Sequence, residues 1–359
     1  RAPAVRAPAV RAPAVRAPRR RRRQNQRLPN YKVGDIINEK FQNKSRFSVP
    51  YDYRVEKILN NEYESQVYSV RNLNDNELYV FKCDNYNTQV YNDSIITGQI
   101  LKKQFRRLVN IFYPNGLWEP DEKGISKLYI KGVPSIVNIS DPRSTCMIMD
   151  YFGEGDLKNI IQNHCATFTK ESIIIFSINI LNVLEFIHSG GFINNDIKPE
   201  NIVFMELNPI NVLLSIPYII DFGIAKKYIY DDIGIRQTIN NSEGTNIWLS
   251  TFSMDGNSLG MRDDLESIGF VILNLSTRNC QLPWNETNLD FKLQPPEQLC
   301  QSVIFPTMKA ALIIYFTYVR NLRLDKFPDY NYIYEIFNLD NYNRNNEFNI
   351  RITPNPIFN

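Results

Sequence analysis

The feature that most constrains the fold of this chain is a change in its hydrophobic pattern part way along the sequence. Segments with strand character, separated by Asn-rich turns, occur at residues 53–59, 66–72 and 77–83. These segments predict three antiparallel strands. Apolar residues at helical spacing in 95–109 predict a helix, and residues 128–130 and 146–151 predict further strands.

Beyond Gly155 the pattern becomes mostly helical. Within residues 172–188 the apolar side chains that share one helical face are Ile173, Phe176, Ile180, Leu184 and Ile187. Such a stripe is more typical of a helix packed against a core than of a ligand site. A strand-rich first third followed by a helix-rich remainder indicates an α+β fold in two lobes with a cleft between them.

A basic, low-complexity tail precedes this body. Residues 1–18 repeat Arg-Ala-Pro-Ala-Val, and an unbroken arginine run extends from Arg19 to Arg23. Proline at every fifth position prevents a continuous helix and the like charges repel, so residues 1–28 are predicted to be disordered, with a linker over 29–50. The arginine run is either a segment that binds polyanions or a nuclear-import receptor, or a repeat expansion without a role.

The composition excludes several classes of protein. With 359 residues, 43% hydrophobic and 22% charged, the chain is typical of a globular protein with one large or two modest domains. The formal net charge is +3, but ten arginines lie in the first 27 residues, which leaves an acidic body. Only two histidines are present, His164 and His188, which excludes multi-histidine metal sites and disfavours a Ser-His-Asp triad.

The spacing of the cysteines and the length of the longest apolar run help to predict the compartment of the protein. The five cysteines, which form no Cys-x-x-Cys pair, are Cys83, Cys146, Cys165, Cys280 and Cys300. An odd number at wide spacing predicts reduced, intracellular thiols rather than a disulfide framework or a zinc site. The longest apolar run, residues 173–187, is interrupted by polar side chains, whereas a membrane span needs ~20 predominantly apolar residues. The sequence therefore predicts no membrane contact.

Two short motifs carry the chemistry. Residues 196–201 read Asp-Ile-Lys-Pro-Glu-Asn, and an Asp-Phe-Gly triplet begins at Asp221. Together they supply a carboxylate that accepts the proton of a hydroxyl, a cation for a moving phosphoryl group, and an amide with a second carboxylate to hold Mg²⁺. Asp-Phe-Gly alone also occurs in turns by chance, but the order and spacing of the two motifs predict phosphoryl transfer.

These motifs resemble those of eukaryotic protein kinases, and their neighbours resemble the casein kinase I family and the vaccinia-related kinases. The segments that carry this closer resemblance are Gly244-Thr245, Gly256 and residues 262–269, 282–284, 318–325 and 328–330. Ser250-Thr251-Phe252 stands where most protein kinases have Ala-Pro-Glu. The resemblance covers residues 52–340. It implies a bilobal kinase domain over 51–345, with a small β-rich N-lobe (51–152), a larger α-helical C-lobe (153–345) and a C-terminal tail (346–359).

The resemblance also implies roles for residues of the C-lobe. Asp196 would be the catalytic aspartate, and Lys198 the phosphate-contacting lysine typical of Ser/Thr kinases. Thr245 would support the catalytic aspartate, and Asp264 would brace the loop that carries it. The implied Mg²⁺ ligands are Asn201 and Asp221.

In the N-lobe the resemblance implies an ATP site. Its residues would be Lys82, Met149, Asp150, Phe152, Leu59 and Val67. Lys82 would reach the α- and β-phosphates, Met149 would be the gatekeeper, and Asp150 to Phe152 would form the hinge to adenine. The alternatives are a solvated lysine on an edge strand and an ordinary core methionine.

The chain departs from the family pattern where the phosphates should bind. Residues 58–68, in place of a glycine-rich loop, contain no glycine and carry Glu62 and Glu64. Backbone amides approach phosphates less closely when side chains intervene. The missing glycines therefore predict weaker nucleotide binding.

Thr97 or Gly98 stands where the helix glutamate that pairs with the strand lysine is expected, unless Asp93 or another acid takes that place. Without that partner Lys82 is poorly oriented, and the active arrangement of the lobe is less favoured.

Two further differences concern the C-lobe. Asn194 and Asn195 replace the His-Arg pair that usually precedes the catalytic aspartate. Between Asp221 and Gly244 the chain carries Lys226, Lys227 and Arg236. These cations either select acidic or already phosphorylated substrates or form an ordinary solvated charge run.

Taken together, these patterns predict an ATP- and Mg²⁺-dependent serine/threonine protein kinase that acts on protein substrates as a monomer in the cytoplasm or nucleus. The alternative is a pseudokinase scaffold that keeps the fold and binds proteins. Retention of all four of Lys82, Asp196, Asn201 and Asp221 favours the enzyme, and the missing glycines favour the scaffold. The high asparagine content suits an AT-rich genome, such as that of a large DNA virus or of a protist. For a viral protein the compartment would be the host cytoplasm or the virion.

Overall fold

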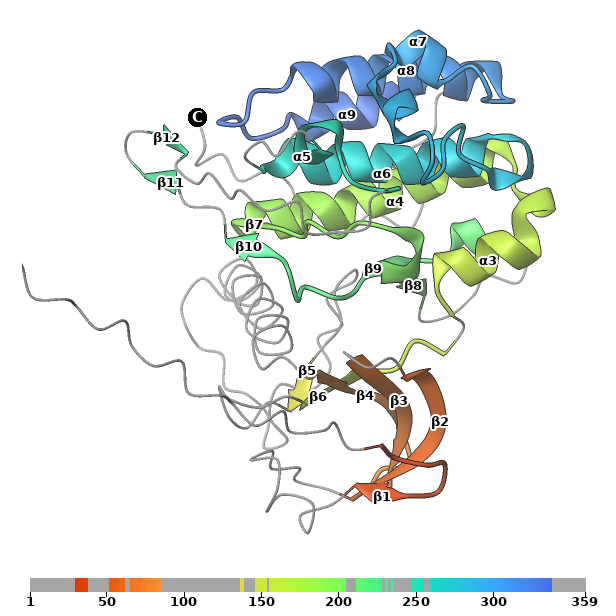
Figure 1. Ribbon diagram of the computed structural model, residues 1–359, viewed down its shortest axis with the longest axis vertical. Coiled ribbons are helices and arrows are strands. Elements are labelled where there is room, and N and C mark those ends of the chain that lie inside the picture. Colours follow the sequence, from red (N-terminus) through yellow and green to blue (C-terminus); the bar gives the residue numbers. More distant parts are fainter. Residues whose placement is uncertain are drawn as a thin grey trace, which may run out of the picture.

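The computed structural model describes residues 30–37, 52–61, 65–84, 136–138, 146–153, 155–204, 211–227, 230–231, 234–235, 247–254 and 259–337. Within these residues a curled antiparallel sheet lies at one end of the molecule and a stack of helices at the other (Figure 1). This arrangement confirms the predicted α+β fold in two lobes. The predicted tails, the helix at 95–109 and the strand at 128–130 lie outside the described residues.

The N-lobe is a six-stranded sheet in the order β1-β2-β3-β4-β6-β5. Its strands are β1 (Ile36–Ile37), β2 (Tyr53–Asn61), β3 (Ser65–Asn72), β4 (Leu78–Asp84), β5 (Ile136–Asn138) and β6 (Cys146–Asp150). The strands predicted at 53–59, 66–72, 77–83 and 146–151 are therefore confirmed. All five strand pairings in this sheet are antiparallel.

The sheet begins upstream of residue 51, inside the segment expected to be a linker. Ile36 of β1 pairs with Arg54 of β2. The ring of Tyr31, 5% exposed, meets the ring of Tyr68 edge-on at a centroid distance of 5.5 Å. A short strand without an amphipathic pattern is difficult to predict from the sequence. The pairing of β1 with β2 and the contact between Tyr31 and Tyr68 place this segment in the N-lobe.

The two faces of the sheet bury different sets of side chains. Because successive residues of a strand point to opposite faces, Phe81 and Cys83 lie on one face of β4, and Val80 and Lys82 lie on the other. The first face packs into a cluster with Tyr53, Tyr68, Val70 and Ile148. The second face carries the cluster of Val80, Met147 and Met149, against which Val67 packs. The same alternation that builds the N-lobe core therefore turns Lys82 away from it.

The C-lobe contains most of the helices. They are α3 (Leu157–His164), α4 (Lys170–Ser189), α5 (Thr251–Met254), α6 (Met261–Ser276), α7 (Pro296–Leu299), α8 (Pro306–Asn321) and α9 (Tyr330–Phe337). Short 3₁₀ turns are η2 (Cys165–Thr167), η3 (Pro199–Asn201), η4 (Val212–Leu214), η5 (Arg278–Cys280) and η6 (Leu289–Leu293). Short strands are β7 (Phe192–Ile193), β8 (Ile202–Phe204), β9 (Pro217–Ile219), β10 (Lys226–Lys227), β11 (Tyr230–Asp231) and β12 (Gly234–Ile235). In Figure 1, α4, α6 and α8 follow one another away from the sheet.

Helix α4 confirms the helix predicted over 172–188. Thr169 caps its N-terminus, because its side chain accepts from the backbone of Ser172 and the Ser172 hydroxyl accepts from the backbone of Thr169. The predicted apolar stripe is buried along its whole length. By length and hydropathy alone α4 matches a membrane span, the one helix of the described residues to do so. However, 61% of that window is buried inside the protein, where α4 packs against α6 and α9 as a core helix does.

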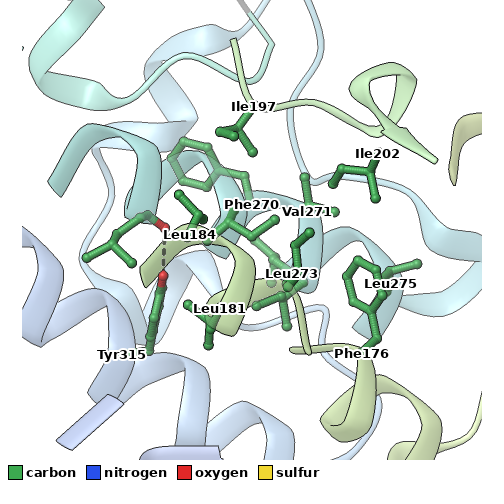
Figure 2. Close-up of a cluster of buried hydrophobic side chains, with 14 of the residues drawn as sticks. Phe176, Leu181, Leu184, Ile197, Ile202, Phe270, Val271, Leu273, Leu275 and Tyr315 are labelled. Carbon is green, nitrogen blue, oxygen red and sulfur yellow. Dashed lines mark hydrogen bonds between the residues drawn. The ribbon is translucent and has the colours of Figure 1, made fainter. Parts of the chain in front are cut away.

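Helix α6 forms the centre of the C-lobe, and every residue of it except Arg262 is buried. Figure 2 shows its Phe270, Val271, Leu273 and Leu275 packed with Phe176, Leu181 and Leu184 of α4. On the other side α6 meets α8 at Gly269. A Cβ atom there would lie 2.7 Å from the ring of Tyr315, so the close approach of the two helices requires glycine.

Four of the five cysteines form disulfides, so the prediction of reduced thiols is wrong for these four. Cys83 of β4 is bonded to Cys146 of β6, and Cys165 is bonded to Cys280. Cys300 is a free, buried thiol. The paired cysteines are 63 and 115 residues apart in the sequence, and only strand pairing and helix packing bring them together. The argument from the absence of closely spaced cysteines therefore fails.

The disulfide between η2 and η5 is expected to stabilise the folded protein. Because it closes a loop over 115 residues, replacing Cys165 and Cys280 together by serine should lower the free energy of unfolding by about 2–4 kcal/mol. The measurement is urea unfolding of the purified protein without reductant, with Cys300→Ser as the control for loss of a buried thiol. Equal stability of the double variant and the wild type would contradict the expectation.

Candidate active site

Lys82 lies inside the sheet and reaches the C-lobe. Its strand β4 is flanked by β3 and β6, and its cross-strand partners are Val67 and Met147. The residue is 8% exposed, which excludes the solvated edge-strand alternative. Its Nζ donates to Oδ1 of Asp221 over 2.9 Å. This ion pair joins the N-lobe sheet to the C-lobe.

The face of the sheet that carries Lys82 is otherwise apolar. Val67 packs against the cluster of Val80, Met147 and Met149, so two residues assigned to an ATP site from the sequence meet here. Val80 and Met147 were not predicted. Counting back two residues from Lys82 would have identified Val80, because residues two apart share a strand face.

The remaining predicted ATP-site residues do not join this cluster. Phe152 is buried in a separate cluster with Val203 and Tyr218 of the C-lobe. Leu59, near the end of β2, is 41% exposed. Asp150 is partly buried at the end of β6. Tyr151, in the middle of the predicted hinge, does pack against the cluster of Val80, Met147 and Met149. The structure thus supports a common location for Val67, Met149, Lys82 and Tyr151.

Loop 194–201 holds its acidic, basic and amide side chains in contact. Lys198 Nζ donates to Asp196 Oδ2 over 2.7 Å. Asn201 Nδ2 donates to both the backbone oxygen and Oδ2 of Asp196, each over 2.9 Å. Pro199 starts the 3₁₀ turn η3 that positions Asn201. Burial raises the pKa of the Asp196 carboxyl above its ordinary value, and the adjacent Lys198 ammonium limits that rise.

A short hairpin brings Asp221 beside this loop. Strand β8 follows Asn201 and pairs with β9, which ends just before Asp221. Ile220 N donates to the backbone oxygen of Asn201 over 3.0 Å. The interval of about twenty residues between the two motifs is therefore the length of a hairpin that returns the chain to its starting point. Asp221 itself adopts a left-handed backbone conformation with φ 62°, which is uncommon for a residue other than glycine.

The Asp221 carboxylate is stabilised in its charged form. Surrounding protein atoms alone would raise the pKa of this carboxyl, but the Lys82 ammonium and the backbone N–H of Gly223 hold the pKa below its ordinary value. The side chain keeps 39% of its surface exposed. An ionised and accessible carboxylate is what a cation site requires.

The donor set fits Mg²⁺. The nitrogen of the Asn201 side chain is committed to Asp196, which leaves its amide oxygen as the group that can ligate. Asp221 accepts the hydrogen bonds from Lys82 Nζ and Gly223 N at Oδ1. The described residues hold no group of three or more His, Cys, Asp or Glu that could bind a metal alone. Mg²⁺ commonly takes one or two protein oxygens and completes its shell with phosphates and water.

Asp264 binds the backbone of the loop that carries Asp196. Its Oδ2 accepts from Asn194 N over 2.7 Å, and its Oδ1 accepts from Asn195 N over 2.8 Å. Its Oδ2 also contacts Nε2 of His188 at 2.9 Å. His188 was not assigned a role from the sequence, in which it directly follows the apolar stripe that ends at Ile187.

Asn194 links the two acidic residues despite its departure from the family pattern. Its Oδ1 accepts from Asp196 N over 3.0 Å, and its Nδ2 donates to the backbone oxygen of Asp221 over 3.2 Å. An asparagine can make both contacts because its side chain is both donor and acceptor. The replacement of histidine therefore retains a connection between loop 194–201 and Asp221.

Thr245 lies outside the described residues. Segment 247–254, which follows it, is held in place by side chains of α6 and of the residues after α6. The contacts are Trp284 Nε1 to Ile247 O, Lys292 Nζ to Leu249 O, Ser250 Oγ to Asp263 Oδ1, Thr251 N and Oγ1 to Glu266 Oε2, and Arg262 over the ring of Phe252. The other carboxylate oxygen of Glu266, Oε1, pairs with Arg320 Nε over 2.7 Å. Glu266 and Arg320 belong to the segments that carry the family resemblance, and Lys292 lies shortly after one of those segments. Spacing alone did not identify the partners of these three residues.

The basic pair Lys226 and Lys227 lies beside the loop. Strand β10, which consists of these two residues, pairs with β7, and Lys227 is opposite Phe192. Lys227 is exposed. Arg236, Glu62, Glu64, Thr97 and Gly98 lie outside the described residues.

The burial of Asp263 predicts how the free energy of unfolding depends on pH. Burial raises its pKa from 3.8 to about 6, against hydrogen bonds from Ser250 and Gly260. The folded carboxyl keeps its proton up to about pH 6, whereas the unfolded carboxyl loses it near 3.8, so this group's contribution to stability falls as the pH rises from about 4 to about 6. Asp263→Asn removes the titration and can still pair with both neighbours.

Relative to wild type, Asp263→Asn should therefore gain up to about 2–3 kcal/mol in free energy of unfolding between about pH 4 and pH 7. Urea unfolding at several pH values measures this difference, with Asp290→Asn as the matched loss of an exposed carboxylate. A difference between Asp263→Asn and wild type that does not change with pH would contradict it.

Comparison with known protein families agrees with the geometry of the site. A family model described as protein kinase domain matches residues 53–310, most of the chain. The matched range begins with β2 and includes Lys82, loop 194–201, Asp221 and the whole of α6. The chain therefore belongs to the protein kinase family.

Proposed function

We propose that this protein is an active, ATP- and Mg²⁺-dependent serine/threonine protein kinase of the casein kinase I type. A protein kinase domain implies transfer of a phosphoryl group from ATP to protein substrates with the help of Mg²⁺. The observation that carries the proposal is the meeting of four residues from three segments of the chain. Lys82 binds Asp221, Asn201 binds Asp196, and the β8–β9 hairpin holds the two pairs together.

The sheet face around Lys82 supplies a nucleotide site. Val67, Val80 and Met149 offer an apolar surface for a flat base, and the Lys82 ammonium is the cation for the phosphates. Asn201 and Asp221 would hold Mg²⁺, which when bound neutralises charge on the phosphate oxygens. The exposed part of Asp221 and its lowered pKa support this assignment.

Asp196 would act on the substrate hydroxyl. Its carboxylate accepts the hydroxyl proton as the oxygen attacks the γ-phosphorus, the bond between that phosphorus and the bridging β–γ oxygen breaks, and ADP leaves. Lys198, with its Nζ 2.7 Å from Asp196 Oδ2, is placed to stabilise negative charge on the transferred group. A lysine two residues after the catalytic aspartate supports preference for serine or threonine.

The position of Lys226 and Lys227 supports a preference for acidic or already phosphorylated substrates. These residues lie on the strand that pairs with β7, the segment that leads into loop 194–201. A cation beside the reacting group attracts substrates with negative charge near the acceptor hydroxyl.

The proposal also includes the partners of the basic tail and the compartment of the protein. The arginine run from Arg19 to Arg23 supports binding to polyanions or to an import receptor. We infer a monomer in the cytoplasm or nucleus, or, for a viral protein, in the host cytoplasm or the virion.

A second candidate is a pseudokinase scaffold with little or no nucleotide turnover. Two observations favour it. Residues 58–68 contain no glycine, and Lys82 is bonded to the carboxylate assigned to Mg²⁺. An ammonium on that carboxylate competes with a metal ion for the same oxygen.

The decisive test is transfer of labelled γ-phosphate from ATP and Mg²⁺ to casein, an acidic protein. We expect Asp221→Ala to reduce transfer by at least about 100-fold, because it removes charge at the developing phosphoryl site. Asp290→Ala, which removes an exposed carboxylate of the C-lobe, is the matched control and should retain activity. Thermal unfolding of both variants confirms that they fold.

The same assay separates the two candidates. If wild type and Asp221→Ala are equally inactive, and ATP with Mg²⁺ does not raise the melting temperature of the wild type, the scaffold stands and the kinase proposal falls. Transfer that Asp221→Ala does not reduce would point to a contaminating kinase.

Substrate preference provides a separate prediction. Lys227→Glu should raise KM for an acidic peptide by about fivefold, because it replaces attraction by repulsion, and should leave KM for a neutral peptide nearly unchanged. Lys326→Glu makes the same charge change at an exposed site after α8 and serves as the control. Equal effects on the two peptides would contradict the charge argument.

A further inference from the structure

A buried chain of hydrogen bonds connects the C-terminal helix α9 to loop 194–201. The Tyr330 hydroxyl lies 2.7 Å from Nδ1 of His188, and Nε2 of the same ring lies 2.9 Å from Asp264 Oδ2. The other contacts of Asp264 are the backbone N–H groups of Asn194 and Asn195. Tyr330, His188 and Asp264 are each 3% exposed or less. Their segments are far apart in the sequence, and the chain of contacts is sealed from solvent.

The donors and acceptors in this chain can be assigned. Two backbone N–H groups and one imidazole nitrogen converge on the Asp264 carboxylate, whose oxygens accept. Nε2 of His188 therefore carries a proton, which it donates to Asp264. Burial raises the pKa of the Tyr330 hydroxyl well above its ordinary value, so this hydroxyl keeps its proton and can donate it to Nδ1 of His188. The tyrosine thus holds the ring in the orientation that presents Nε2 to Asp264.

The loop backbone at the end of this chain needs such support. Asn195 has φ 67°, in the left-handed region that residues other than glycine adopt uncommonly, asparagine more readily than most. Asp264 holds the N–H groups of Asn194 and Asn195, which lead into this turn of the backbone, and Asp196 follows immediately. If the carboxylate of Asp264 could rotate, the loop would be free to relax and the Asp196 side chain would lose its orientation.

We propose that Tyr330 is a positioning residue, which acts through His188 and Asp264 to fix the backbone at Asn194 and Asn195 and thereby the orientation of Asp196. Helix α9 is then part of the apparatus that orders the loop rather than only a cover for the C-lobe core. The kinetic consequence rests on the proposed kinase function, whereas the structural consequence does not.

The chain offers a matched pair of variants for the test. Tyr330→Phe removes only the hydroxyl that binds His188. Tyr315→Phe removes an equally buried hydroxyl, which donates to Leu265 O over 2.7 Å, the hydrogen bond drawn as a dashed line in Figure 2. Both variants lose one buried hydrogen bond of a tyrosine, but only the first lies in the chain to loop 194–201.

The readout is amide hydrogen exchange of Asn194 and Asn195, expressed relative to the most protected amides of α6 to remove changes in global stability. Tyr330→Phe should accelerate the relative exchange by about fivefold or more, and Tyr315→Phe should leave it unchanged. An unchanged ratio in Tyr330→Phe, or an equal change in the two variants, would overturn the proposal.

Enzyme kinetics extend the test. Tyr330→Phe should lower kcat by about fivefold with KM for ATP unchanged, and Tyr315→Phe should not change kcat. If wild type transfers no phosphate, the kinase function fails but the exchange experiment still decides the structural role. If Tyr330→Phe leaves kcat unchanged in an active enzyme, the positioning of Asp196 by Tyr330 is refuted.

A measurement on the wild type guards against a variant that does not fold. The chain has two histidines, so ¹⁵N spectra of histidine-labelled protein, with His164→Gln for assignment, report the tautomer of His188 directly. Protonation at Nε2 with an unprotonated Nδ1 supports the chain, and protonation at Nδ1 alone overturns it.

Discussion

The C-lobe is organised by buried carboxylates. Helix α6 is buried along nearly its whole length, yet it carries Asp263, Asp264 and Glu266 in its first two turns. A buried charge is unfavourable unless hydrogen-bond donors surround it, so each carboxylate requires donors from other segments. Asp264 takes them from loop 194–201, while Asp263 and Glu266 take them from segment 247–254. The need to satisfy one helix thus fixes both loop 194–201, which carries Asp196, and segment 247–254.

A second constraint is the contact between the lobes. Within the described residues, Lys82 of the N-lobe is paired with Asp221 of the C-lobe. The pair orients the lysine and keeps the aspartate ionised, both of which favour phosphoryl transfer. It also occupies one oxygen of a carboxylate assigned to Mg²⁺. The same ion pair therefore supports the active arrangement of the polypeptide and competes with the ligands that arrangement would bind.

Much of the site follows from the sequence because local rules decide it. The stripe in α4 obeys a helical period, and the alternation of β4 selects one face for Lys82. The order and spacing of two motifs identify Asn201 and Asp221, which the pairing of β8 with β9 brings together. Residues that act through distant partners could not be predicted in this way. The partners of Glu266 and Lys292 depend on how helices stack, and β1 is recognised only through its pairing with β2.

The error about cysteines has the same origin. Cys83 and Cys146 are 63 residues apart, and their contact depends on β4 and β6 being neighbours in the sheet. A spacing rule that looks for close pairs tests only local geometry, so it is blind to cross-strand bridges. Tertiary structure, rather than composition, determines which thiols can meet.

The disulfide between these two strands also bears on how deeply the N-lobe lysine is placed. Cys83 follows Lys82 directly, and its partner Cys146 precedes Met147, the residue opposite Lys82. A slip of one residue between the strands would turn every side chain of β4 to the wrong face. A covalent tie one position away forbids that slip. The register of β4 against β6 is therefore locked independently of the hydrogen-bond ladder, and the lysine stays on its side of the sheet even where the surrounding lobe loosens.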